Sequence, residues 1–115
     1  MSLESITERT RVFAAERDWE QFHTPKNLAM ALAGEAGELV AEFQWLTPAE
    51  SANLNLEQRA AVTEELADVL IYLCRLADVA EIDLEQAALD KLAANSQRYS
   101  IEVAKGNALK VEKSD

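Results

Sequence analysis

The chain contains few of the residues that interrupt helices or cross-link a fold. Its 115 residues include three glycines, two prolines and one cysteine. No segment alternates β-branched and polar residues like a half-buried strand, so the sequence predicts helices throughout. A single thiol excludes an intramolecular disulfide and a zinc site built from cysteines. Cys74 lies in an apolar run, where an inert, buried thiol is expected.

Basic residues are also scarce. The chain carries 11 lysines and arginines against 21 aspartates and glutamates, which gives a formal net charge of −10. Such a surface repels phosphate backbones and anionic membranes, so we expect neither a nucleic-acid nor a membrane partner. A polyanionic nucleotide would be repelled too, unless divalent cations mediated the contact. Excess acid more often serves solubility alone, and this alternative stays open.

Targeting and membrane-spanning segments are not evident in the sequence. The first residues contain neither a basic region nor an apolar stretch, and no hydrophobic run is long enough to span a bilayer. We therefore expect a cytoplasmic protein. A chain of this length forms one domain, residues 1–115, with a thin core, and small helical domains often extend their core by dimerising.

Capping residues divide the chain into four predicted helices. They run from Ser5 to about Arg17, Thr24 to about Trp45, Asn55 to about Ala80, and Asp83 to about Tyr99. Residues 18–24 are expected to form a loop that packs onto the body, and residues 46–55 the longest break. From about residue 102 to 115 the sequence predicts a polar tail that is partly flexible. The fold class is all-α, a four-helix bundle.

The second predicted helix places acidic residues beside an apolar stripe. The apolar positions at helical spacing are Leu28, Leu32, Leu39 and Phe43. Glu35 falls within this stripe, and Glu38 lies one turn further along the same face. A glutamate inside an apolar stripe needs a partner, yet no Lys or Arg occurs between Lys26 and Arg59. A bound metal ion would resolve this conflict.

The third predicted helix repeats the arrangement. Its expected core stripe consists of Leu66, Val69, Leu70, Leu73 and Ala77. Glu65 lies at the edge of the stripe and Asp68 three residues on, so antiparallel packing could bring four carboxylates to one point. Hard oxygen ligands suit Mg²⁺ or Mn²⁺. Either acidic pair alone would normally mark a solvated face. A di-iron bundle is disfavoured because the chain has one histidine, His23.

Several motifs resemble one known family. They are Phe13-Ala-Ala-Glu-Arg-Asp-Trp-Glu-Gln-Phe-His23 followed by Pro25 and Asn27-Leu28, Gly34-Glu-x-Gly-Glu-Leu39, Phe43-Gln-Trp45, Glu64-Glu-Leu-x-Asp-Val-Leu-Ile-Tyr72, and Asn95-x-x-Arg-Tyr99. Together they resemble the dCTP pyrophosphatase branch of the MazG-like nucleoside triphosphate pyrophosphohydrolases, over about residues 6 to 110. The paired acids indicate the superfamily, and the run from Arg17 to His23 with both tryptophans points to the branch.

The resemblance implies a function and a set of site residues. Glu35, Glu38, Glu65 and Asp68 would hold Mg²⁺ and form the catalytic centre, where dCTP or a modified dCTP is hydrolysed to the monophosphate and pyrophosphate. The implied nucleotide-binding residues are Trp19, Gln21, His23, Trp45, Tyr72, Lys91, Asn95 and Tyr99. The resemblance also implies a MazG-like bundle completed by dimerisation, with tetramers common and sites at the subunit interface.

Two alternatives to this function remain. One is a broad-specificity nucleoside triphosphate pyrophosphatase, which has the same chemistry without base selectivity. The other is a non-catalytic helical dimerisation module whose acidic residues only confer solubility. Release of pyrophosphate from a triphosphate in the presence of Mg²⁺ separates the enzymes from the module.

Overall fold

The computed structural model describes residues 2–112, and in that part of the chain all regular structure is helical. The all-α prediction is therefore confirmed. The helices form two compact units, Met1–Ile82 and Asp83–Asp115. Within the described residues, no helix has the length and apolar character to cross a membrane. The expectation of a single domain over residues 1–115 stays a prediction.

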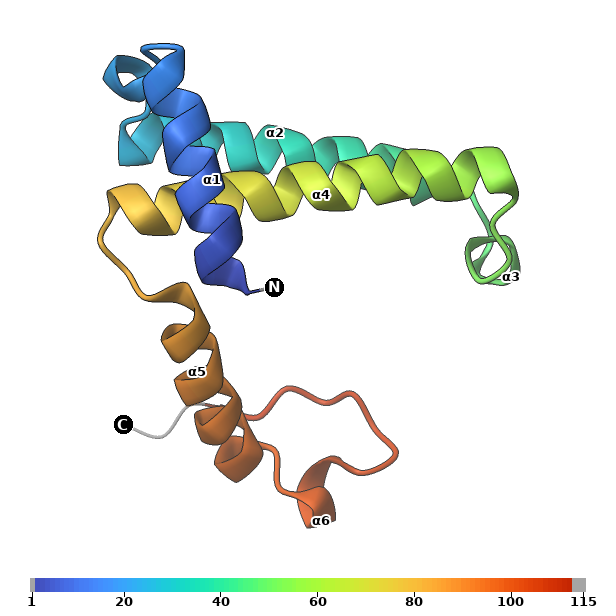
Figure 1. Cartoon of the computed structure of the whole chain (residues 1–115). Helices are drawn as coiled ribbons and strands as arrows, with labels where there is room; N and C mark the ends of the chain where they lie inside the picture. Colours follow the sequence, from blue (N-terminus) through green and yellow to red (C-terminus); the bar gives the residue numbers. More distant parts are fainter. Residues whose placement is uncertain (1, 113–115) are drawn as a thin grey trace. The chain divides into compact units, whose positions relative to one another are not determined.

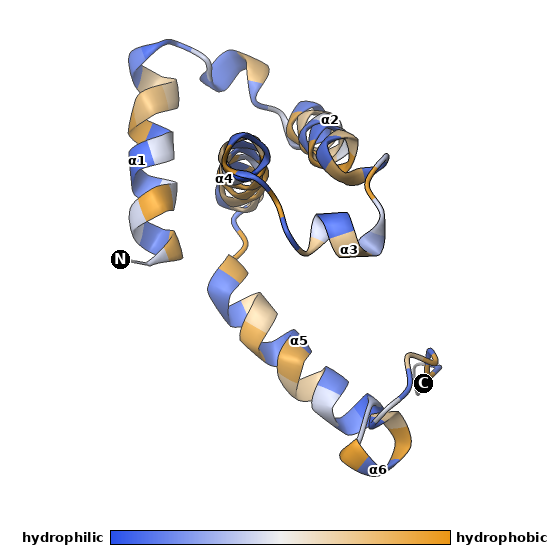
Figure 2. Ribbon diagram, turned by 90° about the vertical axis from the view of Figure 1, so that its right-hand side faces the viewer, coloured by the Kyte–Doolittle hydropathy of each residue, from blue (hydrophilic) through white to orange (hydrophobic). Residues whose placement is uncertain are grey.

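The first unit is built on two long antiparallel helices. Its elements are α1 (Leu3–Glu16), the 3₁₀ helix η1 (Glu20–Phe22), α2 (Pro25–Phe43), α3 (Pro48–Ser51) and α4 (Leu56–Val79). Helices α2 and α4 lie side by side and are joined through α3 at one end (Figure 1). Helix α1 packs against α4, as the end-on view in Figure 2 also shows.

The second unit is shorter. It consists of α5 (Leu84–Arg98) and the one-turn helix α6 (Ile101–Ala104). Helix α6 lies where the sequence predicted the beginning of a polar tail at about residue 102. The last part of that predicted tail, residues 113–115, lies outside the described residues.

Most of the predicted helix starts are confirmed by their caps. The Thr24 hydroxyl accepts from the Asn27 N–H at 3.1 Å, with Pro25 in the first turn, and Asn55 forms a full capping box with Gln58. Helix α1 is different. It begins at Leu3 because Ser2 is the cap, accepting from the Ser5 N–H at 3.3 Å, so the expected capping box at Ser5 is wrong.

The predicted break at residues 46–55 contains a helix that the sequence analysis did not identify. The Thr47 hydroxyl accepts from the Glu50 N–H, and the Glu50 carboxylate accepts from the Thr47 N–H, at 3.1 and 2.9 Å. This reciprocal pair, with Pro48 in the first turn, stabilises the single turn of α3. The small polar residues indicated a loop, although Thr-Pro-x-Glu is itself a helix start.

Two helices of the first unit end on a residue in the left-handed region. At the end of α1, Asp18 has φ 55°, and the Trp19 N–H donates to the Ala14 carbonyl at 2.9 Å. Glu81, with φ 58°, closes α4 in the same way. This C-cap motif satisfies carbonyls that would otherwise lack partners, and it turns the chain back on itself. As a result, the Trp19 ring lies edge-on to Phe13 of α1. His23 is half-buried, whereas the other residues of the 18–24 loop are exposed.

The core is small. Its fully buried apolar residues are Ala14, Leu28, Val62, Cys74 and Ala77, which confirms the buried thiol. The predicted α2 stripe is buried or half-buried along its length. On α4, however, Leu66 is 54% exposed, so its place in the predicted core stripe is wrong. Apolar residues of α2 remain exposed on the face away from α4, Met30 at 64% and Val40 at 57%.

Candidate functional site

Three glutamates converge in the middle of the α2–α4 pair. Glu35 and Glu38 share a face of α2 because they are three residues apart, and Glu65 faces them from α4. One carboxylate oxygen from each of the three lies within 4.8 Å of the others. The structure thus brings together three of the four carboxylates that the sequence proposed.

These carboxylates lack the partners that acidic side chains normally have. Glu35 and Glu65 are half-buried, and one oxygen of each, Oε2, is buried without a hydrogen-bond donor. The ion pairs found among residues 2–112 involve Asp78 and Glu16 and no member of the cluster. Burial of unpaired carboxylates is unfavourable, and several like charges at one point make it more so.

The electrostatics of the cluster follow from this crowding. Loss of hydration raises the pKa of Glu35, and the neighbouring carboxylate of Glu38 raises it further. The pKa of Glu65 is raised by the same loss of hydration and then by Glu38. A cation would remove these penalties, because it would supply the positive charge that the surrounding chain does not.

Two further acidic residues, Asp68 and Glu42, raise pKa values in the cluster without belonging to the group of three. The Asp68 carboxylate is not one of the mutually close ligands, although its charge raises the pKa of both Glu35 and Glu65. Glu42 raises the pKa of Glu65 in the same way. Glu42 is not among the acidic residues predicted from the sequence. It follows Glu35 and Glu38 at helical spacing, seven and four residues on, which is the signal that could have identified it.

The cluster fits a hard divalent cation. It offers carboxylate oxygens from two helices within coordination reach of a common point, and two of them have no other partner. Carboxylates of this kind are the ligands that Mg²⁺ and Mn²⁺ prefer in proteins. The acidic group can therefore hold a metal ion.

A second group of predicted site residues, Trp19, Gln21 and His23, lies just before the start of α2. Trp19 packs edge-on against Phe13 and His23, with ring centroids 5.6 and 6.3 Å apart. His23 accepts a hydrogen bond at Nδ1 from Arg75 Nε of α4, at 3.0 Å. Gln21 donates to the Asp18 carbonyl and carboxylate, at 2.9 and 3.2 Å, so its amide nitrogen serves the loop itself.

Trp45 lies far from these residues in the same chain. It follows the C-terminal end of α2, whereas Trp19 and His23 precede its N-terminal end. A helix of 19 residues is about 28 Å long at 1.5 Å per residue. The structure therefore does not bring the two tryptophans to one base within one chain. Trp45 is 87% exposed, so it is no core residue of the first unit.

The remaining predicted nucleotide-binding residues are divided between the two units. Tyr72 is half-buried on α4 in the first unit, and Lys91, Asn95 and Tyr99 lie in the second. The Tyr99 hydroxyl accepts from Arg98 Nη2 at 3.1 Å and from the Val111 N–H at 3.2 Å, so it organises the second unit. The role of these four residues in nucleotide binding stays a prediction.

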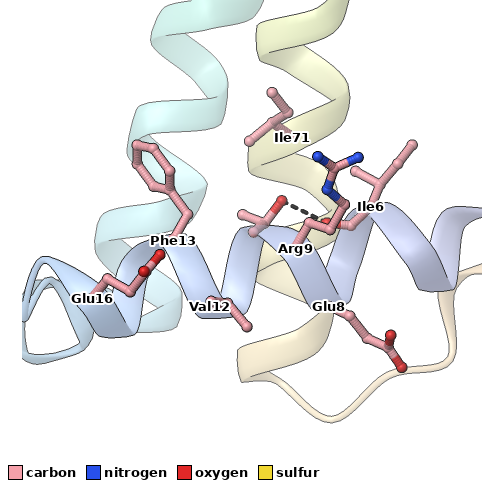
Figure 3. Close-up of a pocket in the computed structure, with 8 residues that line it drawn as sticks. Ile6, Glu8, Arg9, Val12, Phe13, Glu16 and Ile71 are labelled. Carbon is pink, nitrogen blue, oxygen red and sulfur yellow. Dashed lines mark hydrogen bonds between the residues drawn. The ribbon is translucent and has the colours of Figure 1, made fainter.

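A groove of about 740 Å³ runs along α1 and contains none of the predicted site residues (Figure 3). Its apolar lining comes from Ile6, Val12 and Phe13 of α1 and from Ile71 of α4. Val12, Phe13 and Ile71 are between 41% and 56% exposed. Glu8, Arg9 and Glu16 also line it, so the groove is an uncovered apolar surface bordered by charged side chains.

Comparison with known proteins agrees with this geometry. The model of the MazG-like family matches residues 31–113, which include every carboxylate of the cluster. The chain belongs to the MazG-like family. A crystal structure of a pyrophosphatase from Archaeoglobus fulgidus DSM 4304 is similar, with a TM-score of 0.79 and 40% identity, covering 84% of this chain and 91% of that one.

The MazG-like chain also resembles curated animal proteins. It is 49% identical over 111 residues to dCTP pyrophosphatase 1 of Rattus norvegicus, and 48% identical over 111 residues to that of Homo sapiens. Each alignment covers 95% of this chain and 65% of the relative. The chain therefore spans less than two thirds of the length of these animal proteins.

The crowded acids predict how stability depends on pH without metal. Because the pKa values of Glu35 and Glu65 are raised in the folded protein, their neutral forms favour folding. That contribution is fully present below their unfolded pKa values, near 4.5, and is lost as the pH rises through the folded values. With chelator present, Glu38→Gln should raise the unfolding temperature at pH 8 more than at pH 5.

Thermal unfolding with chelator and with Mg²⁺ tests this expectation. Excess Mg²⁺ should stabilise the unmodified chain and have less effect on Glu38→Gln, since a ligand bound only by the folded state stabilises it. Glu112→Gln removes one charge at an exposed position outside the cluster and should change neither result. Equal Mg²⁺ stabilisation of all three proteins would contradict the metal assignment.

Proposed function

We propose that this chain is a pyrophosphohydrolase that converts dCTP, or a modified dCTP, to the monophosphate and pyrophosphate. The observation that carries the proposal is the group of three glutamates with two unpartnered buried oxygens, in a chain 49% identical to a dCTP pyrophosphatase. The role would be removal of unwanted triphosphates from the cytoplasmic nucleotide pool.

Mg²⁺ is the proposed cofactor, with Mn²⁺ as a possible substitute. Glu35, Glu38 and Glu65 would hold it, with Asp68 completing the set. The chemistry that the cation supplies when bound is positive charge, which lets a triphosphate approach a chain of net charge −10 and makes water easier to deprotonate. A carboxylate of the set that is not engaged by the cation then accepts the proton of the attacking water.

The crowding of the carboxylates supports this proton transfer. A second acid lies close to each one that would hold the cation, so an acceptor for the proton is at hand. Attack at the α-phosphorus releases pyrophosphate as the leaving group. The three glutamates must remain close together throughout, and the packing of α2 against α4 holds them.

The nucleoside end of the substrate is assigned to the aromatic residues. Trp19, Gln21 and His23 precede α2 and lie on one side of the acids, and Tyr72 lies on α4. In the second unit, Lys91 is proposed as a phosphate contact and Asn95 and Tyr99 as nucleoside contacts, Asn95 because an amide can both donate and accept at a base edge. Trp45 can act on the same base as Trp19 only if it comes from a second copy of the chain.

A second copy is proposed for this reason and because apolar surface is left uncovered. The exposed face of α2 with Met30 and Val40, and the groove along α1, need a partner. A dimer, with pairing of dimers into a tetramer, would cover such faces, and the proposal requires that it bring Trp45 of one copy beside the aromatic residues of the other.

The first test is a panel of eight common nucleoside triphosphates with Mg²⁺, following pyrophosphate and orthophosphate separately. We expect pyrophosphate, with the highest kcat/KM for dCTP. Glu38→Gln and Asp68→Asn should abolish turnover while the helical circular dichroism is retained. Similar rates for all bases would favour the broad pyrophosphatase, and absence of pyrophosphate release would favour the non-catalytic module.

Stacking of Trp45 on the base predicts a binding defect. Base–aromatic stacking contributes roughly 1–3 kcal/mol, so Trp45→Ala should raise KM for dCTP by about ten- to a hundredfold. Because the side chain is 87% exposed in the isolated chain, folding itself should be little affected. An unchanged KM in a variant with a strongly lowered unfolding temperature would contradict the stacking role.

The expected assembly is at least a dimer at micromolar concentration. Light scattering combined with size-exclusion chromatography measures the mass directly. Val40→Glu places a charge on the exposed apolar face of α2 and should shift the mass toward the monomer and lower activity with it. A fully active monomer would show that no second copy is needed for the site.

A further inference from the structure

The chain has a single histidine, and its protonation state is set by an arginine. Arg75 Nε lies 3.0 Å from His23 Nδ1. A guanidinium remains protonated at any physiological pH and can only donate hydrogen bonds. Nδ1 must therefore be the acceptor in this contact, and in the neutral ring the proton is on Nε2.

Arg75 itself is fixed in place. Arg75 is only 6% exposed, and its Nη1 donates a hydrogen bond to Asp78 Oδ2 at 3.3 Å. Asp78 is held from the other side by Arg11 of α1, whose Nε and Nη2 donate to its two oxygens at 2.9 and 2.7 Å. Such a two-pronged contact orients the carboxylate. The guanidinium of Arg75 cannot turn away from His23 without also leaving Asp78.

The surroundings of His23 oppose its charged form. An imidazolium carries an N–H on both nitrogens, so its Nδ1–H would face the Nε–H of Arg75, and two donors cannot form a hydrogen bond with each other. Burial and the positive charge of Arg75 lower the pKa of His23, and only Glu20 acts in the opposite direction. Among residues 2–112, the ring makes its one hydrogen bond through Nδ1, so Nε2 is left for another molecule.

We propose that Arg75 is a positioning residue that holds His23 as the neutral Nε2–H tautomer, so that His23 donates one hydrogen bond to an acceptor on the nucleoside end of the substrate. This inference rests on the proposed function. It assigns His23 as a donor and excludes it as a general base, because its lone pair is already engaged by Arg75.

The assignment to the nucleoside end follows from the position along α4. Arg75 lies ten residues beyond Glu65, or about 15 Å along the helix axis. The triphosphate belongs at the carboxylates with the cation, so a side chain this far along the helix is on the nucleoside side. A neutral N–H suits a carbonyl or hydroxyl oxygen there, and the adjacent Trp19 ring provides a flat surface.

The direct test is the ¹⁵N spectrum of the histidine ring in the 115-residue chain, without nucleotide. Only one histidine is present, so the signals need no assignment. At pH 7 we expect Nδ1 to resonate as an unprotonated nitrogen and Nε2 as a protonated one. In Arg75→Met the two shifts should move toward each other as the tautomers exchange. Arg59→Met, an exposed arginine on the same helix, should leave the spectrum unchanged.

Addition of ligands to the same protein tests which end of the substrate His23 contacts. With Mg²⁺ present, dCMP should shift the Nε2–H signal, and tripolyphosphate should not. In steady-state assays Arg75→Met should raise KM for dCTP about three- to tenfold, as expected for one hydrogen bond, with a smaller change in kcat. Arg59→Met should leave KM unchanged.

The outcomes separate this inference from the proposed function. An Nδ1–H tautomer or an imidazolium in the unmodified protein at pH 7 would overturn it, even if Arg75→Met did not fold. A response to tripolyphosphate but not to dCMP would overturn the assignment to the nucleoside end. A chain that releases no pyrophosphate would refute the proposed function, while the tautomer in the free protein would still report what Arg75 does.

Discussion

The packing of α2 against α4 is the constraint on which the rest of the molecule depends. It places the carboxylates of Glu35, Glu38 and Glu65 within reach of one point, at a cost, since like charges and unpaired oxygens disfavour the folded state. The apolar stripe along α2, with Leu28 at its most buried position, provides the opposing stabilisation. A cation that binds the acids would remove the repulsion and reinforce the same packing.

The features that sequence could predict are those that depend on local spacing. Leu28 and Leu32 at helical intervals, and the caps Thr24 and Asn55, are read directly from neighbouring residues. Glu35 and Glu38 meet Glu65 because their helices are long, adjacent and antiparallel. Helix α3 was missed because Pro48 and small polar residues also suit a loop. Leu66 was misplaced because helical periodicity gives a stripe, and only tertiary packing decides how far the neighbouring helix covers it.

Features that depend on long-range geometry could not be predicted in this way. Arg75 and His23 are 52 residues apart, and no spacing rule connects an arginine inside an apolar helix to a loop histidine. The distance between Trp19 and Trp45 could not be predicted from the motifs either. The motifs show that both residues are present, but the length of α2 between them determines how far apart they lie. That separation, with Val40 and the groove along α1 exposed, is why a single copy leaves the proposed pocket incomplete.

The two charged groups on α4 behave in opposite ways, and the contrast indicates their roles. Around Asp78 two arginines satisfy one carboxylate, and the pKa of Asp78 is lowered, first by its hydrogen bonds to Arg11. Around Glu65 no positive side chain is provided, and the pKa is raised. A carboxylate that is paired with arginines helps to stabilise and orient its neighbours. A group of carboxylates without a positive partner is suited to binding a cation from outside. Arg75 of α4 thus fixes the neutral His23 ring near one end of the helix, and Glu65 contributes to the negative site in its middle. This arrangement suits a ligand with a nucleoside at one end and cation-bound phosphates at the other.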